Sequence, residues 1–136
     1  MREIFNFLQV TSIAIGAFLG KFLGGFDGFL YALVIFVVID YITGVMVAIL
    51  EKKLASNYGF RGILKKVVIF ILVAAAHIID HRILESGSAI RTAVIFFYIS
   101  NEGISILENA GRIGLPIPQK LMDILHQLNK EDDINE

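Results

Sequence analysis

The chain has 136 residues, of which 56% are hydrophobic and only 18% are charged, and its mean hydropathy is +0.72. A soluble domain of this size usually carries about a quarter charged residues, so the composition indicates an integral membrane protein. The net charge of −1 offers no basic surface for nucleic acid, and the absence of cysteine excludes disulfides and thiolate metal sites.

Four segments are long and apolar enough to cross a bilayer, which takes roughly 20 mostly apolar residues in a helix. They are residues 4–23, 29–50, 63–84 and 89–107. The third reaches membrane length only if the flanking Lys65, Lys66 and Arg82 extend their side chains to the interfaces. We therefore predict an all-α membrane protein with a bundle of four transmembrane helices. Three spans, with an external or interfacial N-terminus, are the alternative.

The connection between the second and third spans predicts the orientation. Residues 51–66 carry five basic side chains against the single Glu51, namely Lys52, Lys53, Arg61, Lys65 and Lys66. Lysine and arginine are retained on the cytoplasmic side of membranes, where they also meet anionic lipid. We expect this loop, the C-terminus and, with four spans, the N-terminus to be cytoplasmic.

The chain after the fourth span is predicted to form a separate cytoplasmic region, residues 113–136, following the transmembrane domain of residues 1–112. Pro116 and Pro118 end one helix and open another. A short amphipathic helix is indicated by apolar residues at helical spacing, Leu121, Ile124, Leu125 and Leu128. This helix either lies on the membrane or the bundle, or docks a partner. The acidic residues 130–136 are expected to be a solvated end.

Charged groups at membrane depth mark the candidate functional residues, because each costs about 2.5–3.5 kcal/mol at a helix centre. Asp40 lies near the middle of the second span. It is expected either to bond to a neighbouring helix or to line an aqueous path. Along the fourth span and just beyond it, three- and four-residue steps place six residues on one helix face, all of them polar except Ile95: Arg91, Ile95, Tyr98, Glu102, Ser105 and Asn109. Asn101 and Glu108 are further candidates. Such a face pairs with other helices, lies in the interface or walls a water-filled lumen.

Small residues predict where helices pack closely. Gly16, Gly20 and Gly24 repeat at four-residue steps in the first segment, and Gly44 lies one turn from Asp40. This pattern is a recurrent surface for self-association in membranes. A chain this small has no room for a solute pathway within one copy. We therefore expect a homo-oligomer with any pore between subunits.

Enzymatic and metal chemistry have little support in the sequence. His77, Asp80 and His81 fall on one helix face, but no further acidic or cysteine ligand is near, so we expect interfacial histidines. No nucleophile motif and no phosphate-binding glycine loop is present. We predict no enzyme activity, no cofactor, no metal and no catalytic residue.

Three stretches carry a resemblance to a known family. These are residues 40–44 (DYITG), 56–66 (SNYGFRGILKK) and 97–109 (FYISNEGISILEN), followed by Gly114-Leu115-Pro116-Ile117-Pro118. Over roughly residues 30–128 the chain resembles the toxin-secretion and phage-lysis holin family. Positions that match the family's recurrent polar sites are Asp40, Asn101, Glu102, Glu108 and Asn109.

The resemblance implies a holin of the bacterial cytoplasmic membrane. Holins accumulate harmlessly, then oligomerise into lesions that dissipate the membrane potential and release an endolysin or a toxin, and the host cell lyses. The endolysin or toxin is a functional partner for which no stable binding is expected. Two other classes stay open: a small ion channel or transporter subunit, and an antiholin or membrane scaffold.

Overall fold

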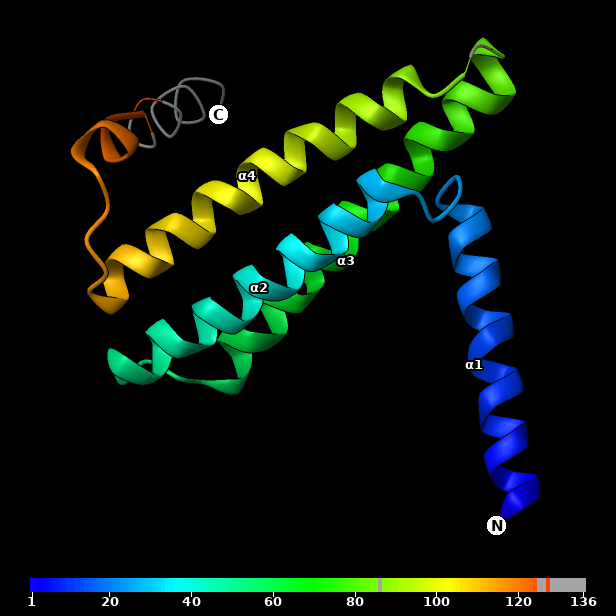
Figure 1. Cartoon of the computed structure of the whole chain (residues 1–136), viewed down its shortest axis with the longest axis horizontal. Coiled ribbons are helices and arrows are strands. Elements are labelled where there is room, and N and C mark those ends of the chain that lie inside the picture. The colour runs from blue at the N-terminus through cyan, green and yellow to red at the C-terminus, as the bar shows by residue number, and fades with distance from the viewer. Residues whose placement is uncertain (86, 125–126, 128–136) are drawn as a thin grey trace.

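A computed structural model describes residues 1–85, 87–124 and 127 of the chain (Figure 1). The elements in order are α1 (Arg2–Phe22), α2 (Gly28–Leu50), α3 (Ser56–Ile78), the π-helical η1 (Ile79–Leu84) that continues α3, and α4 (Ala89–Ile113). Four helical segments are long and apolar enough to cross a membrane: Arg2–Phe22, Gly28–Leu50, Gly59–Leu84 and Ala89–Ile113. The all-α prediction is confirmed.

The connection between α2 and α3 is shorter than predicted. Residues 56–62 lie before the predicted third span, in the predicted cytoplasmic loop, but they form the first turns of α3, so that Arg61 is helical like Lys65 and Lys66. Lysine and arginine are good helix formers, so their charge does not end a helix. At the other end of the bundle α4 continues to Ile113, beyond the predicted end at residue 107, and stops at Gly114, which has a φ of 112°.

Three of the helices form the bundle. α2 and α4 run in the same direction and share the most extensive contact, and α3 runs antiparallel to both and contacts each (Figure 1). The shared core contains six buried apolar residues: Leu30, Leu33, Val37, Ile69, Val73 and Ile95. Along α2 the buried positions follow the alternating three- and four-residue spacing of packed helices. The core therefore occupies the half of the bundle where α2 begins.

Helix α1 extends away from the bundle (Figure 1). It is described along its whole length and buries none of its residues. A side-chain carbon at Gly16 would meet nothing within 4 Å, and one at Gly20 would meet only Phe26, at 3.9 Å. The predicted self-association through these glycines stays a prediction.

The bundle exposes many large apolar side chains and buries several charged or polar ones beside its apolar core. Large apolar side chains on all four helices are exposed, whereas the buried residues include Asp80, Arg91, Glu102 and Asn109. In water this arrangement would be unfavourable, because exposed apolar surface costs free energy and buried charges must be paired. In lipid it is the expected one, since charged side chains turn toward the bundle interior.

A cluster around Arg91 joins the turn before α2 to the start of α4. The buried Arg91 side chain donates from Nε to the carbonyl oxygen of Leu23 at 2.6 Å, and from Nη2 to that of Gly25 at 2.8 Å. Its Nη1 lies 2.8 Å from Oδ2 of Asp27, and Oδ1 of the same carboxylate accepts from the backbone N–H of Leu30 and so caps α2. At the opposite end of the bundle, Arg112 of α4 pairs with Glu51 at 2.6 Å. Ion pairs thus fix the parallel register of α2 and α4 at both ends.

Asp80 completes the Arg91 cluster from the third helix. Its carboxylate is 1% exposed and accepts from the backbone N–H groups of Ile90 and Arg91, at 3.1 and 2.8 Å. Carboxylates are stabilising at a helix N-terminus, where the first N–H groups have no helical partner. Asp80 therefore ties the start of η1 to the start of α4.

The prediction that Gly24 continues the helix-packing stripe of α1 is wrong. Gly24 lies in the turn after α1 with a φ of +92°, a conformation that glycine adopts without strain. A side-chain carbon there would lie 2.6 Å from Nε of Arg91 and 2.7 Å from Nδ1 of His77. The glycine is needed to admit the arginine, which a pattern of spacing alone does not reveal.

Gly24→Ala is therefore expected to lower stability more than Gly25→Ala. Both positions have positive φ, at +92° and +102°, so both changes carry the same backbone strain of about 1–2 kcal/mol. Only Gly24→Ala also displaces Arg91, which adds about 1–3 kcal/mol of overpacking. Thermal unfolding of the two purified variants in detergent measures the difference. Equal melting temperatures would contradict the packing role.

The Asp27 carboxylate makes stability depend on pH. The hydrogen bond from Arg91 holds the pKa of Asp27 below its ordinary value of 3.8. A lowered pKa in the folded state stabilises the fold above pH 3.8, and this contribution is lost as the pH falls through the lower value. Asp27→Asn, which can still cap α2, is expected to flatten the fall in melting temperature between about pH 5 and 2. A pH dependence identical to that of the unaltered chain would contradict this.

Candidate functional site

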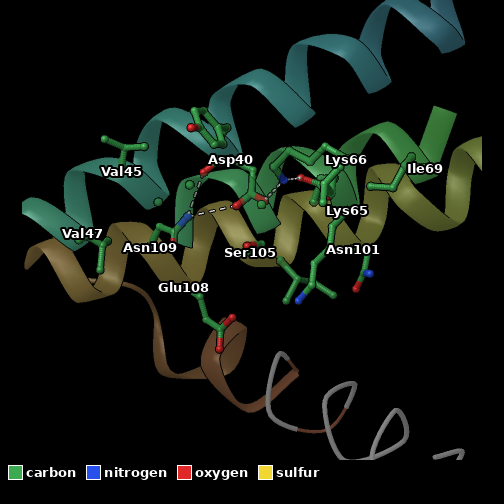
Figure 2. Close-up of a pocket in the computed structure, with 18 of the residues that line it drawn as sticks. Asp40, Val45, Val47, Lys65, Lys66, Ile69, Asn101, Ser105, Glu108 and Asn109 are labelled. Atoms are coloured by element: carbon green, nitrogen blue, oxygen red, sulfur yellow. Dashed lines mark hydrogen bonds and ion pairs between the residues drawn. The ribbon is translucent and has the colours of Figure 1, made fainter. Parts of the chain in front are cut away.

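The centre of the bundle holds an ionic network contributed by three helices. The Lys66 ammonium of α3 donates to Asp40 Oδ2 of α2 at 2.6 Å and to Glu102 Oε2 of α4 at 2.9 Å (Figure 2). The side chains are 16%, 11% and 9% exposed. One cation thus bridges two carboxylates that belong to the parallel helices.

Asn109 extends the network along α4. Its Nδ2 donates to Asp40 Oδ1 at 3.1 Å (Figure 2). The same nitrogen also donates to Thr43 Oγ1 at 2.9 Å. The Thr43 hydroxyl donates in turn to the carbonyl oxygen of Ile39, at 2.9 Å. The Asn109 amide packs beside Gly44, where a side-chain carbon would lie at an ordinary contact distance of 3.8 Å from Nδ2. We refer to Asp40, Thr43, Lys66, Glu102 and Asn109 as the Lys66 network.

The network is satisfied internally. Among the described residues, every buried side-chain nitrogen or oxygen atom has a hydrogen-bond partner. Two carboxylates and one ammonium leave one unit of negative charge if all three are ionised. Removing one partner of a buried pair typically costs about 3–5 kcal/mol, because the other charge is left uncompensated. The charge balance of the bundle therefore depends on Lys66.

A cavity of about 800 Å³ adjoins the network (Figure 2). It lies between the first half of α3 and the second halves of α2 and α4, at the end of the bundle that carries the α2–α3 connection. Its polar lining includes Asp40, Lys66, Asn101, Glu102, Ser105 and Glu108. The cavity thus reaches to the charges, while the apolar core closes the other half of the bundle.

Most of the predicted polar candidates meet at this site. Asp40, Glu102 and Asn109 belong to the network, and Tyr98, Asn101, Ser105 and Glu108 line the cavity. Asn101 and Glu108 are exposed. Arg91, predicted on the same face, is buried in its own cluster with Asp27 and Asp80.

The sequence pattern does not predict the role of Lys66. The loop prediction groups Lys66 with Lys52, Lys53, Arg61 and Lys65, and those four side chains are exposed. Lys66 instead points into the bundle. A signal was present: Lys66, Ile69, Val73, Ala76 and Asp80 follow one another at three- and four-residue steps and form the inner face of α3. Lys65, one position earlier, lies outside that face.

Among the described residues, no group of three or more His, Cys, Asp or Glu side chains could hold a metal ion. His77 and His81 stack on each other, with ring centroids 5.7 Å apart.

The arrangement of the Lys66 network suits a change of hydration. Its charges are paired with one another beside a cavity, so separating the helices would expose an acid, a base and amides to water.

Comparison with known proteins identifies the family. A model of the bacteriophage holin family matches residues 17–130. An uncharacterized 14.9 kDa protein of Clostridium perfringens is 41% identical over 132 residues, which cover 96% of this chain and 99% of that protein. An uncharacterized protein of Listeria monocytogenes is 45% identical over 87% of this chain and 84% of its own length.

A phage relative is also similar. A probable holin of Bacillus phage phi105 is 38% identical over 96 residues, which cover 71% of this chain and 70% of that protein. No solved structure matches the chain. The family model covers the whole three-helix bundle, including the Lys66 network and the Arg91 cluster. The chain belongs to the bacteriophage holin family.

Proposed function

We propose that this protein is a holin: it oligomerises in the bacterial cytoplasmic membrane and forms lesions that dissipate the membrane potential and release an endolysin or a toxin. The observation that carries the proposal is an ionic network buried inside a lipid-facing bundle, in a chain of the bacteriophage holin family. Because its charges are paired, a single copy of the chain can stay in lipid without damaging the membrane. The same charges can form a hydrated wall once copies cluster.

The size of the chain supports a lesion built from many copies. The cavity beside the Lys66 network, about 800 Å³, is far too small to pass a folded protein. The apolar outer surface of the bundle and the uncovered α1, with Gly16 and Gly20, offer surfaces for further copies. We infer a homo-oligomer in contact with membrane lipid, through which an endolysin or toxin passes without stable binding.

The proposed orientation places the α2–α3 connection and the C-terminus in the cytoplasm, because Lys52 and Lys53 lie in that connection. The cavity then opens toward the cytoplasmic half of the membrane. Residues 119–124 are helical after Pro118, as expected for the C-terminal amphipathic helix. Leu125, Leu128 and the acidic residues 130–136 lie outside the described residues.

The proposal is tested by inducing the chain in bacteria that hold a cytosolic endolysin without an export signal of its own. We expect a lag, abrupt loss of membrane potential, release of a large cytoplasmic enzyme, and lysis only when the endolysin is present. Loss of potential without enzyme release would indicate a small ion channel or transporter subunit instead. No effect at verified membrane expression would indicate an antiholin or a scaffold.

Glu102→Gln is expected to delay lysis or abolish it in this assay. The change removes the excess carboxylate, so that Lys66 and Asp40 form a neutral pair and the closed bundle loses its unbalanced charge. Glu85→Gln, at an exposed position after η1, is the matched control. Unchanged timing of the Glu102 variant at equal protein levels would remove this side chain from the mechanism.

A thiol at position 105 reports whether the polar face becomes hydrated. The chain has no cysteine, so Ser105→Cys introduces a single reactive group on the cavity wall. Its alkylation by a charged maleimide is expected to rise several-fold when membranes are sampled after triggering, because a thiolate forms only in contact with water. Val38→Cys, on the exposed outer face of α2, should stay weakly labelled. Equal increases at both positions would contradict a specific hydrated face.

A further inference from the structure

Helix α3 is held less firmly than its two neighbours. The ion pairs of Asp27 with Arg91 and of Glu51 with Arg112 join the two ends of α2 to the two ends of α4. Asn109 adds a third connection between the same helices, to Asp40 and Thr43. α2 and α4 therefore form a unit with polar contacts at three levels.

The contacts of α3 differ between its two halves. At its far end, η1 continues the helix and Asp80 caps α4 through two backbone N–H groups. Next to it, Ile69 and Val73 lie in the apolar core. The first half faces the cavity of about 800 Å³ and reaches α2 and α4 through the side chain of Lys66.

The lipid environment gives this single polar contact its weight. Apolar surfaces gain little by associating in lipid, because the acyl chains are as apolar as the side chains they replace. Buried ionic contacts are strong there, since the alternative is an unpaired charge at membrane depth. The Lys66 ammonium is thus the main attachment of the first half of α3.

We propose that Lys66 is the positioning residue that keeps the bundle closed, and that opening is a swing of the first half of α3 away from the α2–α4 unit. The η1 end is the pivot, where Asp80 stays on the N-terminus of α4. This inference rests on the proposed holin function and names the movement that exposes its polar face. On opening, the cavity widens, and Asp40 and Glu102 line it. Water then replaces the Lys66 ammonium as the hydrogen-bond partner of their carboxylates.

Two adjacent lysines give a matched test. Lys66→Met keeps a long unbranched side chain but leaves Asp40 and Glu102 without their cation, so the lag before lysis should shorten by about twofold or more. Lys65→Met removes the same charge from the same helix at an exposed position that also lines the cavity but lies outside the Lys66 network, and its lag should stay unchanged. Adding Glu102→Gln and Asp40→Asn to Lys66→Met should lengthen the lag again. A lag for Lys66→Met equal to that of Lys65→Met, at equal protein levels, would overturn the proposal.

A pair of tethers tests the movement itself and does not depend on the folding of a charge variant. A side-chain carbon at Gly62 of α3 would lie 3.7 Å from the ring of Tyr41, and one at Gly103 of α4 would lie 3.5 Å from the ring of Phe36. The double variants Tyr41→Cys/Gly62→Cys and Phe36→Cys/Gly103→Cys therefore connect α2 to α3 and α2 to α4. A short bis-methanethiosulfonate reagent joins each pair, and dithiothreitol releases it.

We expect the α2–α3 tether to block lysis and the α2–α4 tether to leave its timing unchanged, with both variants lysing normally after reduction. Lysis despite the α2–α3 tether, or a block by the α2–α4 tether alone, would overturn the swing of α3. These outcomes are distinct from failure of the holin function itself. In that case the unaltered chain and both reduced variants would release no cytoplasmic enzyme.

Discussion

The requirement that every charge in the membrane interior find a partner governs this structure. Asp40 and Glu102 lie on parallel helices, and a single ammonium, that of Lys66, bridges them from the antiparallel helix. Without that cation, two carboxylates at membrane depth would remain uncompensated, a larger penalty than any apolar contact in the bundle could offset. The arrangement of α2, α3 and α4 follows from this pairing together with the ion pairs at the bundle ends.

The two halves of the bundle are built from different interactions. One half has an apolar core around Leu33, Val73 and Ile95, closed by the Arg91 cluster. The other half has the Lys66 network and a cavity. Apolar packing contributes shape complementarity in lipid but little driving force, whereas the polar half can exchange its internal hydrogen bonds for water. The proposed lesion-forming function requires this combination, a bundle that pairs its charges in lipid and can exchange those contacts for water.

Helix α1 lies outside this two-part bundle. It is apolar and long enough to cross a membrane, yet it is attached to the bundle mainly at the turn where Arg91 binds the carbonyl oxygens of Leu23 and Gly25. Its surface is free for lipid or for other copies of the chain. The family model begins within α1, at residue 17, and covers the bundle completely. The match to the bacteriophage holin family therefore includes α2, α3 and α4 in full and the last part of α1.

The sequence by itself determined the helices, their membrane length and the polar face of α4, because apolar runs and three- and four-residue spacings are local properties. It also carried the resemblance to holins, through residues 97–109 and their neighbours. Only the tertiary structure decided which polar groups meet. Lys66 lies 26 residues from Asp40 and 36 from Glu102, and Arg91 lies 64 residues from Asp27. Whether a lysine extends to the interface or turns inward depends on the helix that faces it. For the same reason, the roles of Gly24 and Lys66 depend on tertiary contacts and not on the sequence patterns to which these residues belong.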